Sequence, residues 1–294
     1  MNSDCISIGA KGVCNLLYWN IHGQVTEIVG NKFTDIEFLK VCKDYDILGI
    51  SELHTDTTPS IKGFKLIKDK KRQSKGPKKS GGIAVFAKKE IAHMVKLIPN
   101  NHKDSIWVKI PKNITGEVKD IYLGTAYISP PPRFTSAMRE SNDKHKSLEL
   151  LFEEAQRFST LGEVILQGDL NARIGNEPDF IPKDKYDDIF GIVNHDKNPP
   201  RNSEDRKVCD RGSLLLDLCR SSDYLIANGR KPGDLFGKFS SMQWNGSAVV
   251  DYVITKVTNF ERITELEVGD FLPCLSDHCP LKYRTSFFFI AFIY

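Results

Sequence analysis

The sequence predicts an α/β protein whose β-sheets are covered by helices. Short apolar runs rich in β-branched residues alternate with polar loops along the 294 residues, and such runs are typical of buried strands. Strands are predicted at residues 14–19, 46–51, 82–87, 105–110, 121–128, 164–167, 224–227 and 248–255. Apolar residues at helical spacing predict helices at residues 35–43, 144–158 and 212–220. Each of these helices precedes a strand, which favours the α/β class.

Composition and charge are those of an ordinary globular chain. The hydrophobic fraction is 40%, the charged fraction is 27% and the formal net charge is only +3. Any attraction for nucleic acid must therefore come from local basic patches. The seven cysteines include no CxxC pair, and the chain does not begin with an apolar leader. We therefore expect an intracellular protein in a reducing compartment, without a disulfide framework or a membrane segment.

One domain is expected over residues 13–284, because no repeat and no Pro/Gly-rich linker divides the chain. The proline-containing polar stretch at residues 176–211 is expected to be a long surface loop within it. Residues 285–294 are set apart as an apolar tail whose structure the sequence does not fix. From Ser286 the tail reads SFFFIAFIY, far short of the ~20 apolar residues that span a bilayer. It is either a last buried strand or a sticky end left where a natural reading frame was lost.

Polar side chains of a restricted kind stand where the predicted strands end. Asn20 and Glu52 follow two of the strands, Tyr127 stands near the end of another, and Asp169 and Asn171 follow the strand at 164–167. Ligand sites of α/β sheets collect at strand ends. Carboxylates, amides and a phenol suit a hard cation and a phosphate. Taken singly, Asp169 and Asn171 are equally well explained as a cap for the next loop.

Asp251 is harder to explain as a surface residue. It lies between Val250 and Tyr252 inside a predicted strand, so its carboxylate should be buried. A buried carboxylate needs a partner, and His278 in the late loop Ser276–Asp277–His278 is the expected one. The presence of all these residues in one chain favours a functional site more than any one of them does.

The chain resembles the endonuclease/exonuclease/phosphatase superfamily. The segments that carry the resemblance occur in the family's order between about residues 13 and 284 and read YWNIHG, GISELH, SGGIAVF, AYISPP, LQGDLNARIG, SAVVDYVIT and LSDHCPL. Tyr127 followed by prolines, and the segment CDRGSLLLDLCRSSDYLIANGR, are most similar to the apurinic-like endonuclease domain of non-LTR (LINE-type) retrotransposons. The resemblance implies a four-layer α/β sandwich of two mixed β-sheets flanked by helices.

The resemblance also implies metal-dependent hydrolysis of phosphate esters and a role for each site residue. Glu52 is implied to be a ligand of Mg²⁺, with Asp277 supporting the metal or the water. Asp169 would be the general base that deprotonates the attacking water, with Asn171 holding water or a phosphate oxygen. Asn20 would support the metal ligand and the phosphate.

The remaining implied roles concern the phosphate. Asp251 and His278 would form a dyad in which the carboxylate favours the protonated imidazole, so that His278 donates to the phosphate. Tyr127 would bind a phosphate oxygen or assist the leaving group.

Two positions depart from the apurinic enzymes of the family. His22 stands where those enzymes have an aspartate, and Ser129 and Pro130 stand where they carry an asparagine after the tyrosine. An imidazole is a poorer ligand for Mg²⁺ than a carboxylate, so a second metal position is not expected, or the site accepts Mn²⁺ more readily. The second departure argues against repair of abasic sites as the main role.

A basic run and an aromatic turn are the candidates for contact with DNA. The run KDKKRQSKGPKK at residues 68–79 would attract a nucleic-acid backbone; its candidate contacts are Lys70, Lys71, Arg72, Lys78 and Lys79. The alternative is a solvated surface loop. Trp244, followed by Asn245 and Gly246, is expected at an exposed turn or hairpin tip where it would stack on a base or enter a groove.

The leading hypothesis is a Mg²⁺-dependent DNA endonuclease that nicks one strand to leave 3′-hydroxyl and 5′-phosphate ends, as in retrotransposon target-site nicking. We expect it to act as a monomer on DNA in the nucleus, without a small organic cofactor. The alternatives are an RNA nuclease or a lipid or inositol phosphatase of the same fold. A further alternative is a non-catalytic retroelement remnant that binds DNA.

Overall fold

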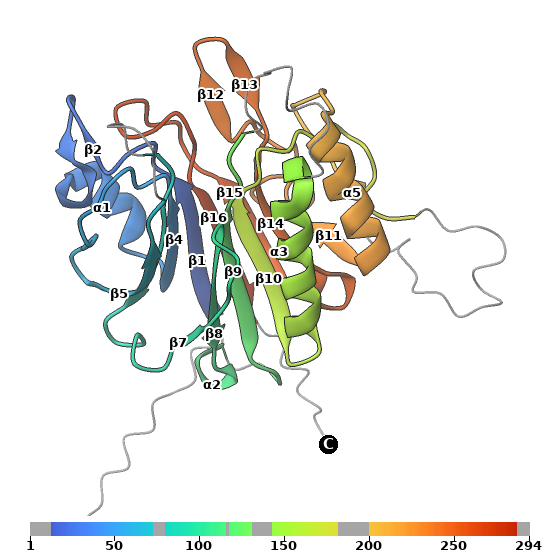
Figure 1. The fold of residues 1–294 in the computed structure, drawn as a ribbon, viewed down its shortest axis with the longest axis horizontal. Coiled ribbons are helices and arrows are strands. Elements are labelled where there is room, and N and C mark those ends of the chain that lie inside the picture. The colour runs from blue at the N-terminus through green and yellow to red at the C-terminus, as the bar shows by residue number, and fades with distance from the viewer. Residues whose placement is uncertain (1–12, 73–79, 116–117, 131–142, 182–199, 287–294) are drawn as a thin grey trace, which may run out of the picture.

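Two large mixed β-sheets packed face to face form the centre of the protein (Figure 1). The computed structural model describes residues 13–72, 80–115, 118–130, 143–181 and 200–286. The first sheet has six strands in the order β15 (Ile263–Val268), β16 (Leu281–Ser286), β1 (Val13–Asn20), β4 (Ile47–Ser51), β6 (Ile83–Lys88) and β5 (Phe64–Lys70). The second also has six, in the order β11 (Tyr224–Ile226), β14 (Asp251–Lys256), β10 (Glu163–Asp169), β9 (Ile121–Tyr127), β8 (Ser105–Ile110) and β7 (Lys96–Ile98).

Helices cover the outer face of each sheet, so the expected four-layer α/β sandwich is confirmed. Helix α1 (Ile36–Cys42) and the 3-10 turn η1 (Lys32–Thr34) pack on the first sheet, and α3 (Asp143–Ser159) and α5 (Asp210–Ser222) pack on the second. The shorter elements are α2 (Lys112–Thr115), η3 (Val257–Arg262) and two hairpins, β2 (Val25–Thr26) with β3 (Gly30–Asn31), and β12 (Ser241–Gln243) with β13 (Gly246–Ala248). No helix of the described ranges is long and apolar enough to cross a membrane.

The predicted helices form for reasons that are visible in their sequences. The side chain of Asp35 accepts a hydrogen bond from the Phe38 amide at 3.0 Å and so caps the start of α1. Phe38 is buried and stacks on Trp19 of β1 with ring centroids 5.4 Å apart. On α3, Leu148, Leu151 and other apolar residues at helical spacing face the second sheet. Burying each such side chain contributes about 1.5–3 kcal/mol.

Several strands that the sequence did not predict lie in the outer part of the first sheet. β15 and β16 alternate apolar and charged residues, and the charged ones pair across the two strands at the surface. Lys282 Nζ lies 3.1 Å from Glu267, and Arg284 Nη1 lies 3.6 Å from Glu265. Strands that face water on one side lack the continuous apolar run of the central strands. β16 reaches Ser286, two residues past the expected domain boundary, and the rest of the tail lies outside the described residues.

One predicted strand is divided in two. The strand was predicted at residues 248–255. Its first residue, Ala248, is the last residue of β13, and β14 begins at Asp251. Asp251 therefore starts a strand instead of lying inside one. It is nevertheless buried, as the sequence predicted, because Asp169 of β10 lies opposite it and Ser240 and His278 contact its side chain.

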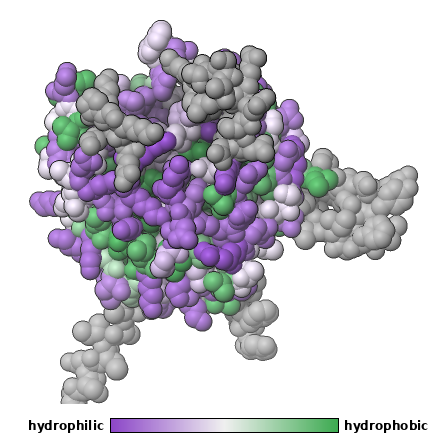
Figure 2. All heavy atoms as spheres, in the orientation of Figure 1, coloured by the Kyte–Doolittle hydropathy of each residue, from purple (hydrophilic) through white to green (hydrophobic). Residues whose placement is uncertain are grey.

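The central strands place their polar ends at one edge of the sandwich. In the parallel pair β1 and β4, Asn20 lies opposite Ser51, and in the parallel pair β10 and β9, Asp169 lies opposite Tyr127. The two sheets approach closely there, since a Cβ at Gly49 would collide with Nε2 of Gln167 in the other sheet. The β12–β13 hairpin projects from this same end (Figure 1). The face shown in Figure 2 is mostly hydrophilic, with scattered apolar patches.

A buried ion pair fastens the segment after β10 to the edge of the second sheet. Arg230 donates to both carboxylate oxygens of Asp179, at 2.6 and 2.7 Å, and both side chains are fully buried. Asp179 also accepts the backbone amide of Ile226 in β11 at 2.7 Å. The pair therefore joins the polar segment that follows the site to a core strand.

Replacing Asp179 by alanine is expected to lower the free energy of unfolding by about 3–5 kcal/mol, because the change removes a buried carboxylate that faces a buried guanidinium. Urea unfolding followed by circular dichroism measures this loss. Asp217→Ala is the control, since Asp217 is 68% exposed and pairs with Arg220 on the surface of α5. That change should cost less than about 1 kcal/mol. Equal losses in the two variants would contradict the role of the buried pair.

Candidate active site

Asp169 is the centre of a hydrogen-bonded group that joins the two sheets. Its side chain is buried, and Oδ2 accepts a hydrogen bond from Asn20 Nδ2 at 3.0 Å. Oδ1 accepts the backbone amide of Asn171 at 2.9 Å, and the Asp169 amide donates to the Tyr18 hydroxyl at 2.7 Å. Tyr18 and Ser51 share a further hydrogen bond of 2.6 Å. The carboxylate is thus held in one orientation by Asn20 of β1 and by the backbone that follows β10.

The expected contact between Asp251 and His278 is present beside Asp169. His278 Nδ1 lies 2.7 Å from Asp251 Oδ2, and the Ser240 hydroxyl donates to the same oxygen at 2.7 Å. The loop that carries His278 is tied to β1, because the Ser276 hydroxyl donates to the Asn20 carbonyl at 2.7 Å. Since Nδ1 is engaged, Nε2 is the ring nitrogen left for a ligand, and His278 lines a cleft there.

The pKa values of these groups are shifted by burial and by one another. Burial, and then the nearby Asp251 carboxylate, raise the pKa of Asp169 to about 8. Burial alone would lower the pKa of His278, but the Asp251 carboxylate raises it to about 10. His278 therefore carries a positive charge near neutral pH, and Asp169 is a stronger base than an exposed aspartate. A base of this kind suits proton transfer near neutral pH.

Glu52 lies at the other end of the site between two imidazoles. Its Oε2 is 3.3 Å from His22 Nδ1 and 3.2 Å from His54 Nε2. Asp277 Oδ1 lies 3.5 Å from His22 Nδ1. Burial would raise the pKa of Glu52, but its contacts with His22, His54 and Tyr127 lower it well below the ordinary value. Glu52 is therefore ionised over the whole neutral range.

Tyr127 stands between the two ends of the site. Burial, and then the Glu52 carboxylate, raise the pKa of its hydroxyl far above the ordinary value. The phenol therefore keeps its proton at neutral pH. It can act as a hydrogen-bond donor to an anionic ligand.

Backbone strain is concentrated in this site. Among the described residues, the non-glycine residues with positive φ are His22, Glu52, His54, Asn171 and Asp223. Asp223 ends helix α5; the other four belong to the site. Such conformations cost energy and persist where the surrounding structure enforces them, which is typical of functional sites.

Two groups of residues have the chemistry to hold a metal ion. Ligand atoms of Asp169, Asp251 and His278 all lie within 4.8 Å of one another. However, both oxygens of Asp169 and one oxygen of Asp251 already accept hydrogen bonds, and His278 Nδ1 is engaged. These three residues are better suited to moving and holding protons. The second group is Glu52 and Asp277: Glu52 is ionised, with its Oε2 beside His22 and His54, and Asp277 Oδ1, like Asp251 Oδ1, is buried and accepts no hydrogen bond from the described residues.

Only some of the basic residues that were predicted to contact DNA are found beside the site. Lys71, Arg72 and Tyr127 help to line a cleft of about 460 Å³, in which Lys71 donates to the Asp56 carbonyl and Arg72 to the Ser129 hydroxyl, both at the exposed surface. Lys70 lines it too, but its ammonium donates to Asn100 Oδ1 at 2.7 Å and to the His102 carbonyl at 2.9 Å. It therefore holds the local fold and is a poorer candidate for DNA than the sequence suggested. Lys78 and Lys79 lie outside the described residues.

Trp244 is 98% exposed at the tip of the β12–β13 hairpin, as the sequence predicted. The hairpin is fastened to the loop that carries the site residues. The amide of Met242 donates to the Asp277 carbonyl at 2.7 Å, and Gln243 Nε2 donates to Asp277 Oδ2 at 3.0 Å. The hairpin that carries Trp244 is therefore joined to the loop that carries Asp277.

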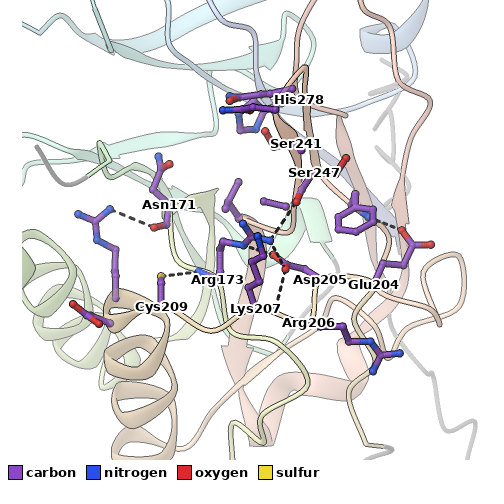
Figure 3. A pocket seen from close by; sticks show the side chains of 18 residues that line it. Asn171, Arg173, Glu204, Asp205, Arg206, Lys207, Cys209, Ser241, Ser247 and His278 are labelled. Carbon is purple, nitrogen blue, oxygen red and sulfur yellow. Dashed lines mark hydrogen bonds and ion pairs between the residues drawn. The ribbon is translucent and has the colours of Figure 1, made fainter. Parts of the chain in front are cut away.

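Some residues of the site were missed by sequence reasoning. Tyr18 and Ser240, which hold Asp169 and Asp251, look like ordinary strand and loop residues, and no sequence signal marks them. A second cleft of about 730 Å³ lies beside His278 and Asn171 (Figure 3). It is lined by the acidic residues Glu204, Asp205 and Asp210 and by the exposed Arg206 and Lys207. All of them belong to the stretch that the sequence presented only as a polar loop.

Comparisons with known proteins agree with this arrangement. The model of the Endonuclease/Exonuclease/phosphatase family matches residues 17–278. No curated protein sequence matches the chain significantly. Its fold is similar to that of an AP endonuclease, LMAP, from Leishmania major, with a TM-score of 0.64 and 12% identity over 94% of this chain and 88% of that one.

Two further solved structures share the fold. The endonuclease domain of TRAS1, a telomere-specific non-LTR retrotransposon, has a TM-score of 0.54 and 16% identity over 92% of this chain and 98% of that domain. A 3′ phosphatase from Neisseria, solved with a product DNA hairpin, has a TM-score of 0.56 and 14% identity over 93% of this chain and 100% of that one.

Replacing Asp251 by asparagine is expected to move the pKa of His278 from about 10 toward the ordinary value of 6.5 or below, because the carboxylate that raises it is removed while the burial that lowers it stays. An NMR titration of the imidazole in metal-free buffer measures this change. Asp217→Asn on the surface of α5 is the control. An unchanged His278 pKa in the Asp251 variant would contradict the pairing.

Proposed function

Because the chain belongs to the endonuclease/exonuclease/phosphatase family, we propose that it is a divalent-metal-dependent DNA endonuclease that nicks one strand to leave 3′-hydroxyl and 5′-phosphate ends. The observation that carries the proposal is the position of Asp169. It is held by Asn20 between an imidazolium paired with Asp251 on one side and the ionised Glu52 on the other. This arrangement offers a base, a cationic donor and a cation site around one point.

Hydrolysis of a phosphodiester must overcome the repulsion between its negative charge and the attacking oxygen. Asp169 takes a proton from the attacking water, with Asn20 fixing the orientation of its carboxylate. His278, held by Asp251 through Nδ1, presents its Nε2–H to a phosphate oxygen. Tyr127 donates its retained proton to another phosphate oxygen or steadies the leaving group. These donors neutralise the charge that grows on the phosphate in the transition state.

Glu52 and Asp277 are the residues that would hold the metal. A bound divalent cation supplies positive charge to a phosphate oxygen or to the leaving oxygen. Mg²⁺ is the expected ion, and one carboxylate with loose support is sufficient for it. Asn20 stands at the end of β1 beside the Glu52 segment and positions groups at both ends of the site.

A nucleic-acid strand is the substrate that the surroundings of the site favour. A cleft with Lys71 and Arg72 lies on the side of Tyr127, and a cleft with Arg206 and Lys207 lies on the side of His278 (Figure 3). Basic residues on both sides suit a chain of phosphates that continues past the scissile bond, whereas a small phosphomonoester would need only one such group. The exposed Trp244 adds a surface for stacking on a base.

The biological setting is proposed from the similarity to the TRAS1 endonuclease domain and from the segments that resemble retrotransposon endonucleases. We propose that the protein acts as a monomer on nuclear DNA and makes the nick that primes reverse transcription of a retroelement. A protein of similar fold, the 3′ phosphatase from Neisseria, was solved with a product DNA hairpin, which supports DNA as the class of substrate.

Incubation with supercoiled plasmid and Mg²⁺ or Mn²⁺ tests the activity. The wild-type chain is expected to convert supercoiled to open-circular DNA, and Asp169→Ala should lower the rate by roughly 10²–10⁴-fold because the general base is lost. Asp217→Ala, remote from the site on α5, serves as the matched control. A wild-type rate no higher than that of Asp169→Ala would exclude nicking and favour a non-catalytic remnant. Faster turnover of RNA or of an inositol phosphate would favour one of the other members of the fold.

The pH profile tests the role assigned to Asp169. Because the base acts in its deprotonated form and its pKa is raised to about 8, the nicking rate should rise with pH, reach half of its maximum near pH 8 and level off about one pH unit higher. The residual activity of Asp169→Asn should lack this rise, since asparagine does not titrate. Initial rates from about pH 6 to about pH 9 at constant ionic strength provide the measurement. A flat wild-type profile would assign the base to another group.

A further inference from the structure

Arg211 is a buried arginine in the first turn of helix α5, and it has no part in the proton transfers proposed above. Its side chain is turned toward the site, where Nη1 donates to the Ser129 carbonyl at 2.9 Å. The same nitrogen donates, at the longer distance of 3.5 Å, to the carbonyls of Leu170 and Asn171. No carboxylate of the described ranges forms an ion pair with it. A buried charge without an opposite charge lowers stability unless its hydrogen bonds offset the cost.

The three carbonyls belong to segments that leave two neighbouring strands of the second sheet. Ser129 follows β9, and the other two residues follow β10. The two segments also bond to each other: the Ile128 amide donates to the Asp169 carbonyl at 2.9 Å, and Asn171 Nδ2 donates to the Ile128 carbonyl at 3.0 Å. Arg211 adds a connection that comes from a helix outside the sheet.

Asn171 is the residue whose conformation depends most directly on these contacts. Its φ is 47°, a left-handed conformation that asparagine adopts more readily than most residues but that still needs support. The Leu170 carbonyl lies in the peptide group before the Asn171 Cα, and the carbonyl of Asn171 itself lies in the peptide group after it. Arg211 donates to both and so fixes the backbone on either side of this Cα. The side chain that this backbone directs lines the same cleft as His278.

Helix α5 is seated firmly against the segment that carries Asn171. A Cβ at Gly212 would lie 1.8 Å from the Arg173 carbonyl oxygen, so only glycine permits this approach. The Cys209 amide donates to the same carbonyl at 3.0 Å, and the Arg173 amide donates to Cys209 Sγ at 3.3 Å (Figure 3). Arg211 therefore reaches the carbonyls from a fixed starting point.

We propose that Arg211 is a positioning residue that holds Asn171 in the orientation in which its carboxamide meets the phosphate. The inference rests on the role proposed for Asn171 in the nuclease. A guanidinium suits this task because it carries several donors and does not lose its proton in a protein. An apolar side chain of similar size would deprive all three carbonyls of this donor.

NMR of the metal-free protein tests the inference without any substrate. The side-chain amide signals of Asn171, assigned by their loss in Asn171→Asp, report the hydrogen bond from Nδ2 to Ile128. In Arg211→Met we expect these signals to move toward those of a free asparagine. Their exchange with water should become roughly tenfold faster, because the segment opens locally.

The plasmid-nicking assay supplies the second measurement. Misplacing a group that acts on the phosphate should lower kcat of Arg211→Met roughly 10–100-fold. KM should change less than about twofold, since the lost interaction is made in the transition state.

Arg220→Met is the matched control for both measurements. Arg220 belongs to the same helix and also donates to a backbone carbonyl, that of Pro178, through Nε at 3.0 Å and Nη2 at 2.6 Å. This variant removes the same chemistry at the other end of α5. It should leave the Asn171 signals and kcat unchanged.

Unchanged Asn171 signals in folded Arg211→Met would overturn the inference, and so would a kcat equal to that of the wild type. An equal change of the signals in Arg220→Met would also overturn it, because the cause would then be a general loosening of α5. If Arg211→Met does not fold, Arg211→Gln, which is neutral and too short to reach the carbonyls, decides in the same way. A wild-type chain that never nicks DNA refutes the nuclease, and the Asn171 signals still decide on Arg211.

Discussion

The site depends on hydrogen bonds that cross between the two sheets at Asp169. Its backbone amide donates to Tyr18, and its carboxylate accepts from Asn20, so two residues of β1 in one sheet fix a residue of β10 in the other. These contacts require that the two sheets pack closely and that the end of β1 lies beside the end of β10. Gly49 permits the close approach, since a side chain there would collide with Gln167. The way the two sheets are packed therefore sets the position of Asp169 relative to the segment that carries Glu52.

Burial at this junction also sets the chemistry of the site. A carboxylate removed from water and placed near a second carboxylate holds its proton more tightly, which raises the pKa of Asp169. The same surroundings favour a charged imidazole at His278, because Asp251 is its direct partner. The site thus combines Asp169, a stronger base than an exposed aspartate, with a His278 side chain that is positively charged near neutral pH. An exposed set of the same residues would have neither property, since water would screen their interactions.

The sequence was sufficient to predict the central strands, because their apolar runs are continuous, and the helices α1, α3 and α5, because their apolar residues recur at helical spacing. It also predicted that Asp251 is buried and that His278 is its partner, since a carboxylate among apolar neighbours has few alternatives. It could not identify Tyr18 or Ser240, because their importance arises from neighbours more than 10 positions away in the chain. The outer strands β15 and β16 were missed because charged residues interrupt their apolar pattern.

His22 illustrates how the structure changes the meaning of one residue. In the sequence it is an isolated departure that weakens a carboxylate site for Mg²⁺. In the structure His54, two residues after Glu52, brings a second imidazole to the same oxygen. His22, Glu52 and His54 all adopt positive φ, a costly conformation that persists where the surrounding structure enforces it. The two histidines are therefore better understood together, as the partners that keep Glu52 ionised and fixed in place, than as decay of the site.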